Sequence, residues 1–156
     1  MAENKKSAVF VCLGNICRSP MAEAVFAHLV RERNLSDKWL IDSAATSDYH
    51  TGENPDSRAQ SVMESHSIHM NHRARPLTAN DFRKFDFIFG MDQSNIRDIK
   101  RQAPKNCKAK ILLLGDYDPE GPCIIEDPYY GVGDEGFEKV YEQCMRCCKA
   151  FLDKES

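Results

Sequence analysis

The sequence predicts an α/β fold, a doubly wound sandwich in which helices cover both faces of a four-stranded parallel sheet. Four short apolar runs have the length and composition of strands that are buried on both faces. Segments with helical periodicity alternate with these runs. The chain has 156 residues, shows no internal repeat and contains no interdomain linker, so we expect a single domain over residues 1–156.

Each expected strand is a short apolar run bounded by polar or turn-forming residues. The four runs lie at residues 8–11, 39–41, 85–89 and 111–114. Parallel neighbours in a sheet need crossover connections, and right-handed crossovers place helices on both faces. We expect the strand order 2-1-3-4, which is typical of flavodoxin-like sheets.

Helices are expected between the strands because apolar residues recur there every three or four positions. Ser19 and Pro20 have the residue types of an N-cap and a first helical position, and that helix should end near Asn34. Asp56 should cap a second helix that continues to about His66. Further helices are expected over residues 92–99 and 137–152.

The composition argues against several classes of function. The chain carries 21 Lys and Arg against 24 Asp and Glu, so a nucleic-acid binder with a broad basic face is not expected. The apolar runs are far shorter than the ~20 residues that cross a bilayer, so membrane insertion is not expected. Seven cysteines, an odd number, without a secretory signal sequence indicate a reducing, cytoplasmic setting.

The turn after the first strand has the composition of a phosphate-binding loop. It begins with Cys12 at the carboxyl end of a buried strand, where sheets of this kind bind ligands, and leads through Arg18 into a helix. Backbone N–H groups and a helix start attract an anion, and an arginine fork can hold two of its oxygens. The other residues expected in this loop are Leu13, Gly14, Asn15, Ile16, Cys17 and Ser19.

Cys12 is expected to be a nucleophile. A helix start and a guanidinium stabilise a thiolate, and a thiolate beneath a phosphate can attack phosphorus in line, giving a cysteinyl-phosphate. Arg18 and the loop amides can neutralise the phosphoryl oxygens, so neither a metal nor another cofactor is expected. Ser19 could donate to the departing thiolate as well as cap the helix.

The leaving group needs a proton, and the loop itself holds no acid. Asp127 lies in the long stretch 117–134 beside Pro128, which restricts the backbone and could hold the carboxyl group over the site. Considered without other motifs, an Asp-Pro turn is the simpler explanation of this pair. Glu126 is the rival acid, whereas an N-cap role explains Asp92 fully.

Apolar and aromatic side chains could form a slot above the phosphate. A slot with aromatic walls would favour phosphotyrosine, which reaches deeper than phosphoserine. Tyrosines in polar loops are equally often ordinary surface residues. The expected walls are Leu13, Ile16, Tyr49, Tyr129 and Tyr130.

One further cysteine and three histidines could carry chemistry. Cys17 lies in the same loop as Cys12, so a reversible disulfide between them is expected on oxidation. The alternative is a loop thiol with no redox role. His66, His69 and His72 are spaced by three without acidic partners at matching spacing, so metal binding is not expected.

Two motifs resemble those of a known family, the low-molecular-weight protein tyrosine phosphatases, also called low-molecular-weight acid phosphatases. Residues 11–23 (VCLGNICRSPMAE) resemble its signature, and residues 127–131 (DPYYG) resemble its second motif. The resemblance extends from Ser7 to the C-terminus. Together with the size of the chain, it points to the eukaryotic cytosolic members of the family. It implies Cys12 as nucleophile, Arg18 as phosphate ligand and Asp127 as general acid.

The resemblance also implies a supporting hydrogen-bond network and two modification sites. The network would include Asn15, Ser19, Ser43 and His72. Tyr129 and Tyr130 would be phosphorylation targets. Gly90 stands where members often have cysteine, and residues 40–75 match least well, so substrate preference is where this chain should differ.

We therefore expect a metal-independent protein tyrosine phosphatase. Its substrates would be phosphotyrosine-containing proteins and small aryl phosphates, and inorganic phosphate would be a product. The alternative is an arsenate reductase of the same fold, which shares the anion loop but needs a downstream cysteine pair to relay electrons. Cys107 and Cys123 do not form an obvious relay, and the DPYYG motif favours the phosphatase.

Overall fold

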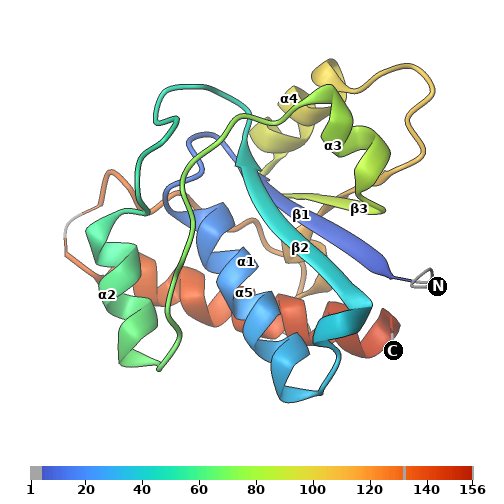
Figure 1. Cartoon of the computed structure of the whole chain (residues 1–156). Coiled ribbons are helices and arrows are strands. Elements are labelled where there is room, and N and C mark those ends of the chain that lie inside the picture. Colours follow the sequence, from blue (N-terminus) through green and yellow to red (C-terminus); the bar gives the residue numbers. More distant parts are fainter. Residues whose placement is uncertain (1–4, 132, 156) are drawn as a thin grey trace.

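The strands and helices of the computed structural model, which describes residues 5–131 and 133–155, form the expected doubly wound sandwich (Figure 1). The four strands are all parallel and lie in the order β2-β1-β3-β4, as predicted. They are β1 (Lys6–Cys12), β2 (Trp39–Ala45), β3 (Phe87–Gly90) and β4 (Lys110–Leu113). Because the strands are parallel, their carboxyl ends meet at one edge of the sheet, where Cys12 lies opposite Ala45.

Helices cover both faces of this sheet. The helices are α1 (Arg18–Glu32), α2 (Ser57–Ser65), α3 (Ala79–Lys84), α4 (Gln93–Gln102) and α5 (Glu135–Glu155), with short 3-10 turns at Ser36–Lys38 and Leu114–Tyr117. Figure 1 shows α1 and α5 together on one face, with α2 beside α5, and α3 and α4 on the other. No helix in the described part of the chain is long and apolar enough to cross a membrane.

The central strand β1 alternates between two hydrophobic cores. Phe10 stacks on Phe89 with ring centroids 5.3 Å apart and meets Phe26 of α1 edge-on at 5.7 Å. Val9 and Val11 face the opposite core beneath α3 and α4. Burial on both faces explains why this strand reads as one continuous apolar run.

The start of α1 differs from the prediction. The helix begins at Arg18, with Cys17 as an N-cap that has no side-chain capping bond, so the prediction that Ser19 caps it is wrong. Pro20 occupies the third helical position, which is acceptable because the first four helical N–H groups have no acceptor within the helix. The Ser19 hydroxyl instead lies 3.0 Å from the Cys12 sulfur.

Other boundaries agree with the sequence or shift by a few residues. Asp56 caps α2 as predicted, because its carboxylate accepts a hydrogen bond from the Arg58 N–H at 2.8 Å. The strand expected at 85–89 spans Phe87–Gly90. Helix α3 was not predicted, since its six residues are too few to show a periodic pattern, although Thr78 and Asp81 form a capping box around its start.

Candidate active site

The loop over residues 12–19 connects β1 to α1 at the carboxyl edge of the sheet and folds around one sulfur atom. The Cys12 side chain is 3% exposed. Asn15 adopts a φ of 59°, a left-handed conformation that Asn tolerates better than most residues. This turn brings the Asn15 N–H to within 3.3 Å of the Cys12 Sγ, to which it donates. The backbone therefore supplies a hydrogen-bond donor to the candidate nucleophile.

Gly14 allows the segment after β2 to lie against this loop. A Cβ atom at Gly14 would stand 2.9 Å from His50 Cδ2, so a larger residue would displace the imidazole. The Thr46 N–H donates to the Cys12 carbonyl at 3.0 Å, and the Ser47 N–H donates to the Leu13 carbonyl at 3.2 Å. These contacts fix residues 46–50 beside the candidate phosphate site.

Arg18 is buried and oriented by two partners that are remote in sequence. Its Nη1 donates to Asp92 Oδ2 at 2.6 Å and to the Ile125 carbonyl at 2.9 Å. Burial opposes the positive charge, but Cys12 and the carboxylates of Asp92 and Asp127 outweigh it and raise the pKa of the guanidinium. Arg18 therefore stays a cation whose orientation is set from outside the loop.

The role expected for Asp92 was incomplete. Its Oδ1 accepts a hydrogen bond from the Asn95 N–H at 2.9 Å, which confirms the N-cap of α4. Its other oxygen forms the ion pair with Arg18. One carboxylate thus joins the start of α4 to the phosphate loop, and capping alone does not explain it.

Asp127 forms the turn that its sequence context predicts and also lies beside the phosphate loop. Its Oδ1 accepts from the Tyr129 N–H at 3.0 Å, as an Asp-Pro turn predicts, and its Oδ2 lies 3.7 Å from Arg18 Nη2. The turn therefore directs the carboxyl group toward the loop. Glu126, the rival acid, is exposed and does not line the pocket that Asp127 lines.

A narrow pocket of about 80 Å³ connects these residues. Cys12 and Arg18 form its buried part, and Tyr49 and Tyr130, which are 72% and 83% exposed, stand at its open side. The pocket is also lined by Leu13, Gly14, Ile16, Cys17, Tyr129 and His50, of which only His50 was not predicted. The side chains of Asn15 and Ser19 are fully buried and do not line it.

Behind the loop, hydrogen bonds hold Asn15 in one orientation. The Arg75 N–H donates to Asn15 Oδ1 at 3.1 Å, which identifies that atom as the oxygen. Asn15 Nδ2 then donates to Ser19 Oγ at 2.8 Å and to Ser43 Oγ at 3.0 Å. Because Ser19 receives this bond, its own hydrogen is available for the Cys12 sulfur.

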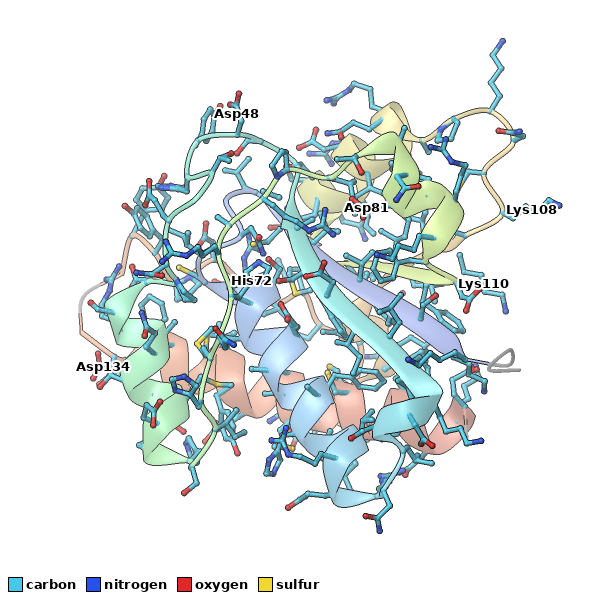
Figure 2. All side chains as sticks on the ribbon, viewed as in Figure 1. Asp48, His72, Asp81, Lys108, Lys110 and Asp134 are labelled. Carbon is cyan, nitrogen blue, oxygen red and sulfur yellow. The ribbon has the colours of Figure 1, made fainter. Side chains whose placement is uncertain are left out.

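His72 and Glu23 complete this network. His72, on the segment between α2 and α3 (Figure 2), places Nε2 2.7 Å from Asn15 Oδ1, an acceptor, so this nitrogen carries a hydrogen. Glu23 accepts from the Ser43 hydroxyl at 2.5 Å and lies 3.2 Å from His72 Nδ1. Burial raises the pKa of Glu23 to about 7, although the Ser43 hydrogen bond acts in the opposite direction.

The three histidines are not brought together. His66 contacts Glu138 at 2.6 Å and His69 contacts Glu64 at 2.8 Å, while His72 belongs to the network. Within the described part of the chain, three ligand atoms suited to a metal lie within 4.8 Å of one another only at Glu23, Asp42 and His72. The Arg75 guanidinium lies 3.1 Å from Asp42, so a positive charge is already present there.

Comparison with known proteins identifies the family. The family model described as low molecular weight phosphotyrosine protein phosphatase matches residues 7–155. The protein of that name from Rattus norvegicus is 62% identical, and the match covers 99% of each chain. The chain belongs to this phosphatase family.

Solved structures of related phosphatases have the same fold. A protein tyrosine phosphatase from Entamoeba histolytica is 37% identical, with a TM-score of 0.92 and 97% of each chain covered. The Drosophila arginine phosphatase is 42% identical, with a TM-score of 0.90 and 96% of this chain and 97% of that chain covered. The fold and the phosphate loop described above are thus those of a low molecular weight phosphatase.

In this phosphatase, Arg58 links α2 to the loop that carries Asp127. Its Nη2 donates to the Tyr129 carbonyl at 3.0 Å and its Nη1 donates to the Gly131 carbonyl at 3.3 Å. Asp56 holds the guanidinium at 3.0 Å, and the Asp56 N–H donates to the Ile16 carbonyl at 2.8 Å. Asp56 and Arg58 therefore connect the phosphate loop to the Asp127 loop.

Sequence analysis did not identify Glu23, His50 or Arg58. Glu23 could have been found, because it follows Ser19 by four residues and so shares its face of α1. His50 and Arg58 carried no signal of their place in the site, since the site groups that they contact, Gly14 and the Tyr129 carbonyl, come from distant parts of the chain. Only the folded chain shows their positions in the phosphatase site.

Proposed function

We propose that this chain is a protein tyrosine phosphatase that hydrolyses phosphotyrosine in proteins and small aryl phosphates without a metal ion. The observation that carries this proposal is the convergence of Cys12, Arg18 and Asp127 on one narrow pocket. The family and the names of the relatives described above support the same activity. Arg18 and the loop amides supply the positive potential that a metal supplies in other phosphatases.

The first step transfers the phosphoryl group to sulfur. The Cys12 thiolate attacks phosphorus, a sulfur–phosphorus bond forms, and the bond between phosphorus and the tyrosine oxygen breaks. Arg18 binds the phosphoryl oxygens through the part of its fork that Asp92 does not use. Asp127 gives its proton to the leaving phenolate, which departs as neutral tyrosine.

The second step releases inorganic phosphate. Asp127, now ionised, takes a proton from a water molecule that attacks phosphorus, and the sulfur–phosphorus bond breaks. The Ser19 hydroxyl, 3.0 Å from the sulfur, donates to the thiolate as it leaves. The network behind the loop orients this hydroxyl, because Asn15 occupies its oxygen as a donor.

The walls of the pocket support an aryl substrate. Leu13, Ile16, Tyr49 and Tyr129 are apolar or aromatic and can contact a phenyl ring on both faces. One structural relative is named an arginine phosphatase, so proteins of this fold can differ in substrate. An apolar wall at Ile16 offers no hydrogen-bond partner to a guanidinium.

Arsenate reduction, the alternative function, is not favoured. The matching family model and the curated relatives described above are phosphotyrosine phosphatases. Cys107 and Cys123 lie on surface loops as free thiols.

We also propose a cytoplasmic location. All seven cysteines are free thiols. The reaction requires Cys12 to remain reduced, and a reducing compartment keeps it so. Phosphotyrosine-containing proteins of the same compartment are then the expected partners.

One experiment tests the proposal. Turnover of nitrophenyl phosphate is measured for the wild type and for Cys12→Ser, each with and without a chelator, and turnover of phosphotyrosine and phosphoarginine is compared in one peptide sequence. We expect activity to vanish in Cys12→Ser, to survive chelation and to favour phosphotyrosine. Activity that persists in Cys12→Ser or disappears with chelator contradicts the mechanism, and a preference for phosphoarginine contradicts the substrate class.

A further inference from the structure

Positive charge is concentrated in one part of this acidic chain. Residues 83–110 contain eight Lys and Arg against three Asp and Glu, whereas the rest of the chain contains thirteen against twenty-one. These residues form the end of α3, then β3, α4 and β4. The last turns of α3 and α4 both carry basic residues, and both precede strands or loops at the edge where the strands begin.

The surface at this edge is hollowed. A hollow of about 480 Å³ is lined by four cationic side chains, those of Lys6, Arg83, Lys108 and Lys110. A second hollow of about 300 Å³ adjoins it and shares Phe82, Arg83 and Lys108. We call these two hollows together the basic groove. Their volumes exceed what a small ion needs.

The two carboxylates in the groove already have partners. Asp86 accepts hydrogen bonds from the Ser7 N–H and the Ser7 hydroxyl, both at 3.1 Å. Glu155 forms an ion pair with Lys6 at 3.3 Å. Glu155 therefore offsets Lys6, whereas Asp86 keeps its charge, so the groove holds four cations against two carboxylates and is net positive.

The central cations are free to bind a ligand. Among residues 5–131 and 133–155, Arg83 and Lys108 have no hydrogen-bond or ion-pair partner, and both line the two hollows. Within the same residues, the Lys110 ammonium has no ion-pair partner and lies over the Phe87 ring, with Nζ 5.7 Å from the centroid. Three cations along one groove thus lack a counter-charge from the protein.

The groove lies away from the candidate active site. Lys6, Phe87 and Lys110 begin their strands, whereas Cys12 and Gly90 end theirs. Figure 2 shows Lys108 and Lys110 at the right of the view, and Asp48 and Asp134 at the left. A ligand in the groove would leave the phosphate pocket open.

We propose that the basic groove binds an extended acidic segment of a partner protein. Charge complementarity requires an anion, and unpaired cations along two adjoining hollows match carboxylates spaced along a peptide. The cations surround two hollows and do not form a flat face, which favours a chain that enters the hollows over a planar membrane surface. The groove is therefore a docking site separate from catalysis.

The test uses a fluorescein-labelled peptide of alternating Glu and Gly, with a Gln and Gly peptide as the neutral control. Binding is followed by anisotropy with excess inorganic phosphate occupying the phosphate loop. We expect Arg83→Glu/Lys108→Glu to weaken binding of the Glu peptide about 10-fold or more, because two attractions become repulsions. Lys139→Glu/Lys149→Glu, exposed positions on α5 with the same change in net charge, should change it less than about 2-fold.

Each outcome decides for or against the groove. If both double variants weakened binding of the Glu peptide equally, the peptide would be attracted by the net charge of the protein alone. Binding of the peptide that appears only when inorganic phosphate is left out would mean binding in the active site. Stronger binding to phosphatidylserine vesicles than to the peptide would assign the surface to a membrane. Selective loss in Arg83→Glu/Lys108→Glu, with nitrophenyl phosphate turnover unchanged in both variants, would support the proposal.

Discussion

Two hydrogen-bond donors stabilise the Cys12 sulfur. The Asn15 N–H and the Ser19 hydroxyl both reach it, at 3.3 Å and 3.0 Å. The left-handed φ of Asn15 directs the first, and the Asn15 amide, by donating to Ser19 Oγ, frees the hydrogen of the second. One residue thus controls both donors, which gives Asn15 a positioning role that its place in the loop motif did not reveal.

The proposed role of Asp127 predicts an effect that depends on the leaving group. Asp127→Asn should lower turnover of phenyl phosphate by about 10²–10⁴-fold, because a poor leaving group needs the proton, and should cost visibly less with nitrophenyl phosphate. Glu126→Gln, one residue away and outside the pocket, is the matched control. An equal loss for both substrates, or a selective loss in Glu126→Gln, would move the acid elsewhere.

The position of Cys17 predicts protection against irreversible oxidation. Peroxide should convert the Cys12 thiolate to a sulfenic acid, which condenses with the Cys17 thiol to give a disulfide and water. Burial raises the pKa of Cys17, so this thiol remains protonated until it reacts. After peroxide treatment, dithiothreitol should restore the wild type but restore Cys17→Ser poorly, with Cys123→Ser as an exposed-thiol control. Equal recovery in all three proteins would show that Cys17 protects nothing.

Among the secondary-structure elements, α2 supports the site although none of its residues lines the pocket. Its N-cap Asp56 binds the phosphate loop through Ile16, and Arg58 in its first turn binds the backbone of the Asp127 loop. The Arg58 guanidinium also lies 4.6 Å from the Phe137 ring centroid at the start of α5. The start of one helix therefore sets the distance between nucleophile and acid.

This arrangement predicts that Arg58 acts on proton transfer. Arg58→Met keeps the aliphatic stem but removes both donors, so turnover of phenyl phosphate should fall about 10-fold to 100-fold while nitrophenyl phosphate is affected less. Arg58→Lys should recover part of the loss, since an ammonium can reach one carbonyl but not two. Arg73→Met, which removes a donor to the Gly52 carbonyl, is the control. A uniform loss across substrates, or a loss of thermal stability alone, would contradict this role.

For the whole molecule, stability is coupled to pH through Glu23. Because burial raises the pKa of Glu23 to about 7, the folded chain holds a proton that the unfolded chain releases near pH 4.5. The contribution of this proton to the free energy of unfolding is thus fully present below about pH 4.5 and is lost as the pH rises through about 7. The loss is up to about 3 kcal/mol. Asp42, His72 and Arg75 surround the carboxyl group and modulate this effect.

Urea unfolding of the wild type and of Glu23→Gln across this pH range checks the coupling. The free energy of unfolding of the wild type should fall relative to that of Glu23→Gln between pH 4.5 and about 7, because glutamine cannot ionise. Glu142→Gln controls for the same change at an exposed position. A constant difference between wild type and Glu23→Gln would show that the carboxyl group does not titrate in this range.

Local patterns in the sequence determined the architecture and the chemistry. The apolar run at 8–11 predicted β1 because both of its faces are buried, and Asp56 predicted the start of α2 because a cap bonds within its own turn. The spacing from Cys12 to Arg18 predicted the phosphate loop because all of its parts are consecutive. Such signals involve residues within a few positions of one another, so the sequence alone displays them.

Only the tertiary structure decided how the site is held and oriented. Arg18 meets Asp92 across 74 positions, Arg58 meets Tyr129 across 71, and His72 meets Asn15 across 57. The same holds for the basic groove, whose cations come from the start of β1, the end of α3, and β4 with the loop before it. Such long-range contacts depend on the order of the strands in the sheet and on how the helices pack against it. No periodicity or spacing along one chain encodes them, and the folded sheet brings them together.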